Sequence, residues 1–386
     1  MSPASRLSVL AFLCVCLVDQ GSCRYSSYHR PSFHGQTYTP HNSQYGRPNS
    51  GSGPNVEKAD STVILTHVVF RHGNRTAQLS EIYPRDPYYN FDYFPFGRGQ
   101  LTNVGKMREY NVGRELRTRY DKFLGDDFLS RNPLAGLFPP RSDNVWNTAL
   151  NWQPVPYNFL PADRDPVLIG LNCPNYVRKY DSVVRSRKWQ SEFNKDKNVF
   201  AYISKNSGLN VTTYEQIYNL YFGLSTEEEW GHKLPKWTEA VWPKIVTDLA
   251  IKHYYVQTST SQLLSLCEGY HLKKIIEDTK RVVRSASVAN GPKMYLYSGH
   301  ENNVAEMLIL LNVFSPPHIP TYGSYLIFEV HNINNVVGIK LYYQRYVTES
   351  PVLLKIPACD EFCPLDRFEQ LFEEYLPVTE DYCYQN

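Results

Sequence analysis

The strongest constraint on this chain comes from two short polar motifs, each of which directly follows an apolar, strand-like run. The RHGNR motif (residues 71–75) follows the β-branched run TVILTHVVF (62–70), and the SGHE motif (298–301) follows the shorter run MYLY (294–297). A nearly continuous apolar run predicts a parallel strand that is covered on both faces. Because the reactive crevice of an open α/β sheet lies beyond the carboxyl ends of its strands, we expect the two motifs to meet there.

The two motifs together supply two histidines, two arginines and one carboxylate. Guanidinium groups bind phosphate oxygens through paired donors, and a histidine can accept a phosphoryl group on a ring nitrogen. A neighbouring carboxylic acid can protonate the departing oxygen. This set therefore suits phosphoryl transfer without a metal ion. Either motif alone is explained as well by a surface turn or by hydrogen bonding at the end of a strand, so the prediction rests on their combination.

The N-terminus is typical of a secretory signal peptide, which we assign to residues 1–23. Arg6 gives a basic start, residues 7–18 form an apolar stretch too short to span a bilayer, and residues 21–23 offer small side chains for cleavage. We therefore expect a secreted protein, with the lysosomal lumen as second choice, and no membrane anchor. The formal net charge of +2 argues against a nucleic-acid partner.

Composition divides the rest of the chain into an arm, a core in two parts and an insertion. Residues 24–60 are rich in Ser, Tyr, His, Pro, Gly and Asn, which predicts a disordered low-complexity arm. We expect an α/β fold, with a mostly parallel central sheet and flanking helices, from residues 61–151 and 271–386. Residues 152–270, which carry no motif, are expected to form an inserted, mainly helical cap. Two alternating runs between residues 324 and 343 predict an antiparallel hairpin at the sheet edge.

Further motifs accompany the first two along the chain. They are GQLTNVGKMREYNVG (99–113), LAGLFPP (134–140), NCP (172–174), YSGHE (297–301) and CDEFCPL (359–365). With RHGNR they make the chain resemble the histidine acid phosphatases, and within that family most of all the insect venom acid phosphatases. The resemblance covers nearly everything from about Val63 to Cys383, and the set is far more specific than any one of its members.

The resemblance implies a role for each charged residue of the two motifs. His72 would be the nucleophile that forms a phosphohistidine intermediate, and Glu301 would be the proton donor. Arg71, Arg75 and His300 would bind the phosphate. The chain would then be a secreted acid phosphatase, a hydrolase of phosphoric monoesters that acts on a small phosphomonoester or a phosphoprotein. It would need no cofactor and no metal, and a homodimer is a candidate assembly.

Two features depart from the family pattern. The second motif usually ends in His-Asp, whereas this chain has His300-Glu301, and the extra methylene moves the acid by about a bond length. Relatives also carry a central strand and a further phosphate-binding arginine where this chain has only residues 125–133. A strand of about five residues with its two loops normally needs about ten residues or more. The alternative prediction is therefore a catalytically impaired or inactive secreted protein, with Arg131 as the one candidate replacement. A phosphoglycerate-mutase-like transferase is a further alternative, against which the signal peptide argues.

Removal of the signal peptide leaves five of the eight cysteines in an oxidising compartment. The resemblance implies disulfides between Cys173 and Cys383 and between Cys359 and Cys363. Cys267 is then either buried as a small apolar residue or free for an intermolecular bond.

Two sites fit the pattern of N-glycosylation. The Asn-Val-Thr sequence at Asn210 is a plausible acceptor in a secreted chain. The Asn-Arg-Thr sequence at Asn74 lies inside the expected site, where a sugar would block the chemistry, so we expect only Asn210 to be used.

Overall fold

The structure is a computed structural model of the chain that describes residues 57–125, 137, 157–285, 291–345 and 349–384. The chain divides into two compact units, residues 1–51 and 52–386, and all described residues belong to the second. The signal peptide and most of the predicted arm therefore lie outside the described residues. The same holds for the short segment 125–133 apart from Gly125, so these predictions stay predictions.

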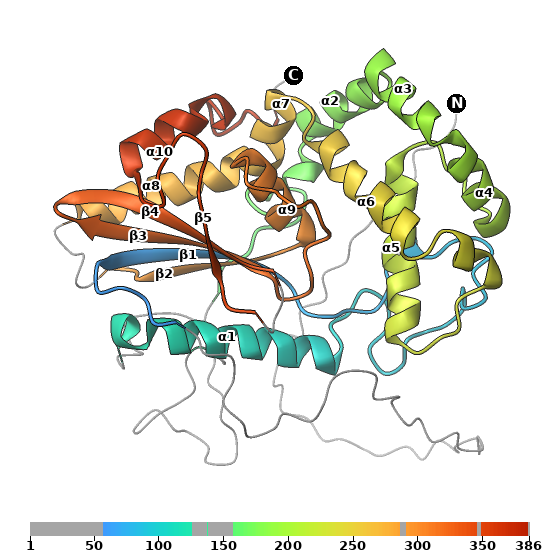
Figure 1. Cartoon of the computed structure of the whole chain (residues 1–386), viewed down its shortest axis with the longest axis horizontal. Coiled ribbons are helices and arrows are strands. Elements are labelled where there is room, and N and C mark those ends of the chain that lie inside the picture. The colour runs from blue at the N-terminus through green and yellow to red at the C-terminus, as the bar shows by residue number, and fades with distance from the viewer. Residues whose placement is uncertain (1–56, 126–136, 138–156, 286–290, 346–348, 385–386) are drawn as a thin grey trace, which may run out of the picture. The chain divides into compact units, whose positions relative to one another are not determined.

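The described residues form one mixed sheet with helices on both faces (Figure 1). The strands are β1 (Val63–Arg71), β2 (Met294–Gly299), β3 (Tyr325–Ile333), β4 (Val336–Gln344), β5 (Val352–Leu354) and β6 (Cys363–Pro364). Their order is β2-β1-β3-β4-β5, and β6 also pairs with β4. β1 and β2 run parallel, while the other four described pairings are antiparallel.

The predicted α/β fold is confirmed, but its parallel character is confined to β1 and β2. The reason lies in the connection between β3 and β4, which consists of Asn334 and Asn335 with φ angles of 51° and 62°. A two-residue turn in this left-handed conformation joins antiparallel neighbours, whereas parallel strands need a long crossover. The hairpin is therefore correctly predicted, but its place at the sheet edge is wrong. β3 lies between β1 and β4, and β4 pairs on its other side with β5 and β6.

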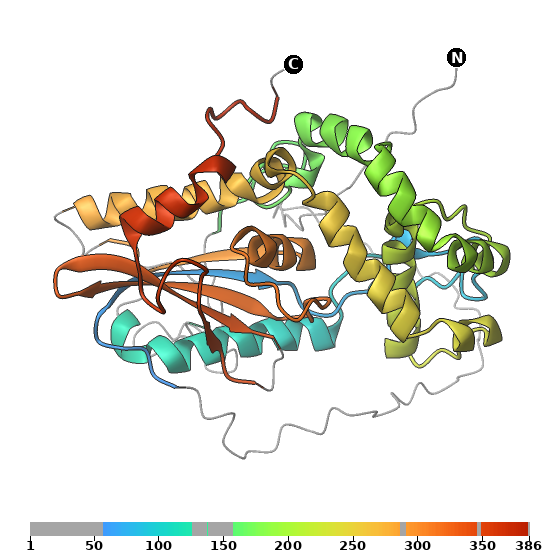
Figure 2. The same cartoon turned by 45° about the horizontal axis from the view of Figure 1, so that its top comes forward.

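Alternate side chains of β1 enter two apolar clusters on opposite faces of the sheet. Val68 and Phe70 pack against the helix α1 (Asn103–Leu124). Val69 packs into the cluster formed with α8 (Tyr270–Arg284), α9 (Glu301–Leu310) and α10 (Leu365–Phe372). Figures 1 and 2 show α1 on one face and α8 and α10 on the other. Burial on both faces explains why the sequence of β1 is apolar throughout.

Between Gly170 and Gly269 every described regular element is helical. The helices are α2 (Pro174–Val184), α3 (Arg187–Lys195), α4 (Lys197–Ser207), α5 (Tyr214–Glu229), α6 (Lys244–Gln257) and α7 (Ser261–Leu264). Short turns are η1 (Leu79–Glu81), η3 (Gly170–Asn172), η4 (Lys236–Ala240), the π-helical η5 (Ser265–Gly269) and η6 (Glu373–Tyr375). Helices α2 to α6 share an apolar cluster, which includes Ile203, Ile217 and Leu249.

No helix in the described part of the chain is both long and apolar enough to cross a membrane.

Candidate active site

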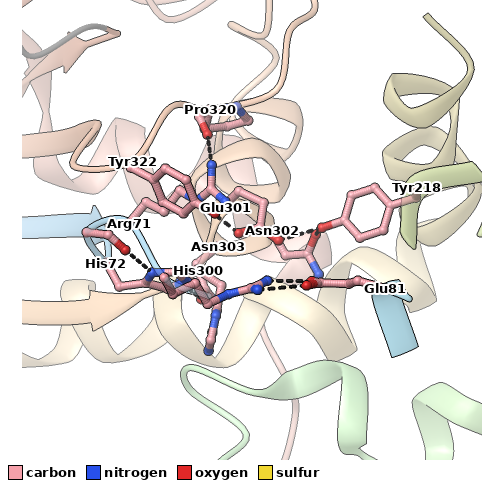
Figure 3. A network of polar contacts seen from close by, with 12 residues as sticks. Arg71, His72, Glu81, Tyr218, His300, Glu301, Asn302, Asn303, Pro320 and Tyr322 are labelled. Atoms are coloured by element: carbon pink, nitrogen blue, oxygen red, sulfur yellow. Dashed lines mark hydrogen bonds and ion pairs between the residues drawn. The ribbon is translucent and has the colours of Figure 1, made fainter. Parts of the chain in front are cut away.

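The parallel pairing of β1 with β2 brings the two motifs together. Arg71 and Gly299 are register partners at the ends of the two strands, and the backbone N–H of His72 donates to the carbonyl of Gly299 at 3.0 Å. The rings of His72 and His300 then lie edge to face, with their centroids 5.3 Å apart. Figure 3 shows Arg71, His72, His300 and Glu301 gathered at this point. The two motifs thus meet at the carboxyl ends of neighbouring strands, where the sequence places them.

The ring of His72 is held so that one nitrogen faces the site. Its Nδ1 lies 2.7 Å from the carbonyl oxygen of Gly73, and because a carbonyl can only accept, Nδ1 carries the hydrogen. Nε2 is therefore a lone-pair nitrogen, and it is buried without a hydrogen-bond partner among the described residues. Burial lowers the pKa of His72 to about 3, with a smaller contribution from the charge of Arg71. The imidazole is thus neutral above that pH.

The loop that carries His72 is fixed by the first turn of α1. A side chain at Gly73 would begin 2.1 Å from the carbonyl oxygen of Gly105, so only glycine fits. The N–H of Gly73 donates to Glu109 Oε1 at 3.0 Å. Thr102 caps the same helix, since its hydroxyl accepts from the N–H of Gly105 at 3.1 Å. Helix and loop are therefore one packed unit.

Arg71 is buried at the end of β1 and is held from three sides. Its Nη1 donates to the carbonyl of Pro320 at 2.7 Å, and its guanidinium carbon lies 3.8 Å from the ring centre of Tyr322. Its Nε lies 3.0 Å from Glu301 Oε2, but the N–H direction does not make a hydrogen bond, so this contact is chiefly electrostatic. Nη2 has no partner among the described residues. Nη2 is thus the donor atom that Arg71 can offer to a ligand.

Arg75 is held by a buried carboxylate that the sequence motifs did not reveal. Its Nη1 and Nη2 donate to the two oxygens of Glu81 at 2.8 and 2.5 Å, and Nη1 also donates to the carbonyl of Thr76. This fork-to-fork geometry is the strongest form of ion pair and occupies the outer nitrogens. Nε remains buried and without a partner in the described structure. Arg75 can therefore offer Nε, together with the second hydrogen of Nη2 on the same side, to a ligand.

Glu301 is the first residue of α9 and is ionised in the unliganded site. Tyr218 on α5 donates its hydroxyl to Glu301 Oε1 at 2.7 Å, as Figure 3 shows. Burial alone would raise the pKa of Glu301, but the surrounding positive groups, of which Arg71 contributes most, together outweigh it and hold the pKa well below its usual range. A proton donor needs the opposite state, so binding of a ligand has to change it.

His300 lies at the N-cap of α9 and is exposed at the site. Its backbone N–H donates to Asn303 Oδ1 at 3.0 Å. A side chain three residues into the helix that accepts from the N-cap N–H is half of a capping box. Asn303 thereby fixes the backbone that carries both His300 and Glu301.

Three buried nitrogens remain without partners at this point: Arg71 Nη2, Arg75 Nε and His72 Nε2. Two are donors and one is a nucleophilic lone pair, so an anion that contains an electrophilic centre would satisfy all three. His72, His300 and Glu301 also place one possible metal-ligand atom each within 4.8 Å of one another. The guanidinium of Arg71 already neutralises Glu301, however, and a second cation beside it would be repelled. The donor set fits a phosphoryl group better than a metal ion.

Sequence reasoning missed several residues that shape the site. Glu81, Tyr218 and Tyr322 come from stretches without any motif, and only the fold brings them to the arginines and to Glu301. Asn303 could have been found, since a polar residue three positions after a helix N-cap is a known signal.

Other predicted residues fall where their chemistry requires. Asn74 is buried and donates its Nδ2 to Glu229 Oε2 at 3.0 Å, so it cannot accept a sugar. Asn210 is exposed in the loop before α5. Cys173 is joined to Cys383 and Cys359 to Cys363 in the structure, with Cα–Cα distances of 5.2 and 5.4 Å, and Cys267 is buried and free.

Comparison with known proteins links this geometry to a family. The sequence profile of the histidine phosphatase superfamily (branch 2) matches residues 130–347. The chain is similar to the venom acid phosphatase of Apis mellifera, at 35% identity over 82% of this chain and 86% of that protein. It is also similar to the prostatic acid phosphatase of Homo sapiens, at 28% identity over 80% of this chain and 84% of that protein. Human lysosomal acid phosphatase shares 26% identity, over 80% of this chain and 77% of its own length.

Two solved structures share the fold. The phytase of Klebsiella sp ASR1 superposes with a TM-score of 0.57 at 14% identity, covering 84% of this chain and 99% of that one. The multiple inositol polyphosphate phosphatase of Bifidobacterium longum, in complex with inositol hexasulfate, superposes with a TM-score of 0.53 at 10% identity, covering 87% and 98%. At such low identity the likeness concerns the fold alone.

Proposed function

Because this chain belongs to the histidine phosphatase superfamily (branch 2), we propose that it is an acid phosphatase that hydrolyses phosphate monoesters through a phosphohistidine intermediate on His72. The observation that carries this proposal is the orientation of the His72 ring. Its Nδ1–H is engaged by the carbonyl of Gly73, and its Nε2 lone pair is left buried and unpartnered beside Arg71 and His300. A nucleophile needs this arrangement, in which the proton is held away from the attacking atom.

In the first step the lone pair of His72 Nε2 attacks phosphorus, the P–O ester bond breaks, and the leaving oxygen takes a proton from Glu301. Arg71 Nη2, Arg75 Nε and His300 donate hydrogen bonds to the phosphoryl oxygens. Because these donors are already in place in the unliganded site, little reorganisation is needed when charge develops.

In the second step a water molecule attacks phosphorus of the phosphohistidine and gives a proton to the Glu301 carboxylate. The P–N bond breaks, its electron pair returns to Nε2 of His72, and inorganic phosphate leaves. Glu301 thus acts first as an acid and then as a base.

The protonation of Glu301 requires the substrate itself. In the unliganded site the charge of Arg71 keeps the pKa of Glu301 well below its usual range. A bound phosphoryl group takes up the charge of Arg71 and places negative oxygens near the carboxylate, and both effects raise the pKa of Glu301. A monoester that arrives with one proton, as such esters do in acid, supplies the proton that the carboxylate then holds.

An acid optimum follows from these two groups. The pKa of His72 is lowered to about 3, so the nucleophile is neutral throughout moderately acidic solution, and kcat/KM should fall only below about pH 3. As pH rises, Glu301 and the ester both lose the proton needed for departure, so activity should decline toward alkali. A pH profile that rises toward alkali would contradict the proposal.

The setting in which the protein acts is also part of the proposal. We infer that it is secreted, or lumenal in the lysosome, that it is glycosylated at Asn210, and that it acts on a small phosphomonoester or phosphoprotein. Its similarity to venom, prostatic and lysosomal phosphatases supports this location. The Cα–Cα distances of 5.2 and 5.4 Å at the two cysteine pairs suit disulfides, which persist in oxidising compartments.

The test is to trap the intermediate. The purified protein is quenched in alkali during turnover of a phosphate monoester labelled in its phosphoryl group, and label should remain on one histidine and be lost in acid. His72→Ala should abolish both label and turnover, whereas His232→Ala, a control whose ring stacks on Tyr88, should keep both. Turnover without label on His72 would refute the mechanism, and absence of turnover in the wild type would favour the inactive alternative.

A further inference from the structure

The helix α5 contributes one continuous face to the site. Tyr218, Phe222 and Glu229 are spaced by four and then seven residues, and an α-helix repeats about every 3.6 residues, so all three lie on the same side. Tyr218 contacts Glu301, and the ring of Phe222 lies 5.2 Å from the guanidinium carbon of Arg71. Two of the three residues on this face therefore touch catalytic groups.

Helix α5 also packs closely against the backbone of Glu81. A side chain at Gly223 would begin 2.2 Å from the carbonyl oxygen of Glu81, the partner of Arg75. This contact fixes the distance between α5 and the two arginines, so the position of Glu229 relative to the reacting atoms is set by packing.

Glu229 is the last residue of α5, and its carboxylate is exposed at the site. Its Oε2 accepts from Asn74 Nδ2 at 3.0 Å, and Asn74 lies directly between Gly73 and Arg75. No cation lies within 4.0 Å of Glu229 among the described residues, although the charges of Arg71 and Arg75 act on it from further away. The carboxylate is thus anchored by an amide, and because partial desolvation raises the pKa of Glu229, it carries its full negative charge only toward neutral pH.

The other charges of the site are already balanced. Arg71 is matched by Glu301, and Arg75 by Glu81. Arg108 donates its Nη1 to the carbonyl of Tyr322 at 2.9 Å and forms no ion pair with Glu229 among the described residues. A phosphoryl group is therefore held by directed N–H donors, and any further negative charge on the substrate approaches the carboxylate of Glu229.

We propose that Glu229 is a specificity-determining residue that favours phosphomonoesters with neutral or cationic leaving groups and discriminates against leaving groups that carry further negative charge. This inference rests on the proposed function. The preferred substrates are then esters of uncharged phenols, of amino alcohols, or of phosphorylated side chains flanked by basic residues. Polyphosphorylated polyols are disfavoured, because every additional phosphate would approach Glu229.

The test uses three aryl monophosphates that differ only in one ring substituent, which is a trimethylammonium group, a hydrogen or a carboxylate. The ratio of kcat/KM for the cationic to the anionic substrate is measured for the wild type, Glu229→Gln and Glu229→Lys. The matched control is Glu228→Gln, an exposed carboxylate on the neighbouring side of the same helix. Comparison of one ratio between enzymes cancels the intrinsic reactivity of the three phenols.

We expect the ratio to fall about fivefold to tenfold in Glu229→Gln, mainly through KM of the anionic substrate, and further in Glu229→Lys. Glu228→Gln should leave it unchanged. The amide oxygen introduced by Glu229→Gln can still accept the hydrogen bond from Asn74. The melting temperature of each variant shows whether its fold is intact. In the wild type, the same ratio should also fall as ionic strength rises, which needs no variant.

The outcomes separate this inference from the function on which it rests. Absence of turnover of all three substrates by the wild type overturns the proposed function, and with it this inference. Turnover with an unchanged ratio in Glu229→Gln overturns this inference alone. An equal shift in Glu228→Gln also overturns it, because the effect would then belong to the general field of the protein.

Discussion

Two buried carboxyl groups on the same helix have opposite charge states. Glu301 and Glu306 lie on α9, little more than one turn apart, and both are withdrawn from water. The charge of Arg71 holds the pKa of Glu301 well below its usual range. Burial raises the pKa of Glu306 well above it, and the neighbouring Glu268 raises it further. Burial by itself thus makes a neutral acid, and only a buried cation makes an ion.

Asn303 connects the surroundings of Glu301 with the buried carboxyl group of Glu268, the neighbour of Glu306. Its Oδ1 accepts from the backbone N–H of His300 at 3.0 Å, and its Nδ2 donates to Glu268 Oε1 at 2.6 Å. Glu268 lies in the π-helical turn η5, and its other oxygen lies 3.1 Å from His271 Nδ1. Glu268, His271 and Asn303 therefore form a chain of buried hydrogen bonds that ends at the backbone of His300. This chain supports the site without a buried ion pair.

Removing the positive charge of Arg71 should cause the largest loss of activity. It should also remove the difference in pKa between Glu301 and Glu306. In Arg71→Met the pKa of Glu301 should rise as that of Glu306 does, and one phosphate donor is lost. We expect kcat/KM to fall about a thousandfold, as is typical when a preorganised charged donor is removed. Steady-state kinetics with 4-nitrophenyl phosphate measures this. Arg367→Met, an exposed arginine on α10, is the control, and a loss of less than tenfold in Arg71→Met would contradict its role.

Exchanging each carboxyl for an amide tests which of the two takes part in chemistry. Glu301→Gln should lower kcat about a hundredfold or more for alkyl phosphates, whose leaving oxygen needs a proton, and much less for 4-nitrophenyl phosphate. Glu306→Gln should leave both rates within a factor of two or so, since Glu306 contacts no reacting group. Equal losses for the two leaving groups in Glu301→Gln would show that this carboxyl does not donate the proton.

Tyr218→Phe should have a smaller effect on the same proton. The hydroxyl donates to Glu301 Oε1 at 2.7 Å, so its loss removes the hydrogen bond that orients the carboxyl toward the leaving oxygen. A hydrogen bond to a charged group is typically worth about 1.5 kcal/mol or more, which corresponds to about a tenfold loss in kcat/KM. The loss should be larger for alkyl than for aryl esters. Tyr202→Phe on α4, whose hydroxyl donates to the carbonyl of Trp237, is the matched control and should retain full activity.

The smallest expected effect concerns stability, and its sign differs between the two carboxyls. The folded pKa of Glu306 is raised, so wild-type stability from this group is lost as pH rises above about 4.5, and Glu306→Gln should gain melting temperature relative to wild type between pH 4.5 and 7. The folded pKa of Glu301 is lowered, so its stabilisation is fully present above about pH 4.5 and is lost as pH falls below that value. Glu301→Gln should therefore melt below wild type by a constant amount between pH 4.5 and 7, and this deficit should shrink at lower pH. Thermal unfolding at several pH values should show a change of roughly 2 °C or more in each case, above pH 4.5 for Glu306→Gln and below it for Glu301→Gln. The same pH range for both changes would contradict the assigned charge states.

The sequence predicts the reacting residues better than their protonation. The apolar runs that precede His72 and His300 predict two strands, and both histidines follow the carboxyl ends of these strands. If the strands are parallel neighbours, the two rings must lie close together. Residue type is enough to predict Glu301 as the proton donor. Its charge state, however, depends on the position of the Arg71 guanidinium, which no local sequence pattern encodes. The antiparallel pairing of β3 with β1 was also missed, since the hairpin pattern of β3 and β4 does not show which strand lies beside it in the sheet.

The supporting residues were beyond sequence reasoning for a related reason. Glu81, Tyr218 and Glu229 carry no motif, and their roles arise from contacts between segments that the fold brings together. Burial is the largest cause of the low pKa of His72, and burial is a property of the whole packed structure.

The bond between Cys173 and Cys383 joins residues 210 positions apart and encloses every helix from α2 to α10. A protease that cut once inside this loop would leave two fragments that still migrate as one species until a reductant is added. Nicked material could thus pass unnoticed through purification and keep its nucleophile and acid in register. Electrophoresis with and without reductant is therefore a necessary check on any preparation whose activity is compared with that of the intact chain.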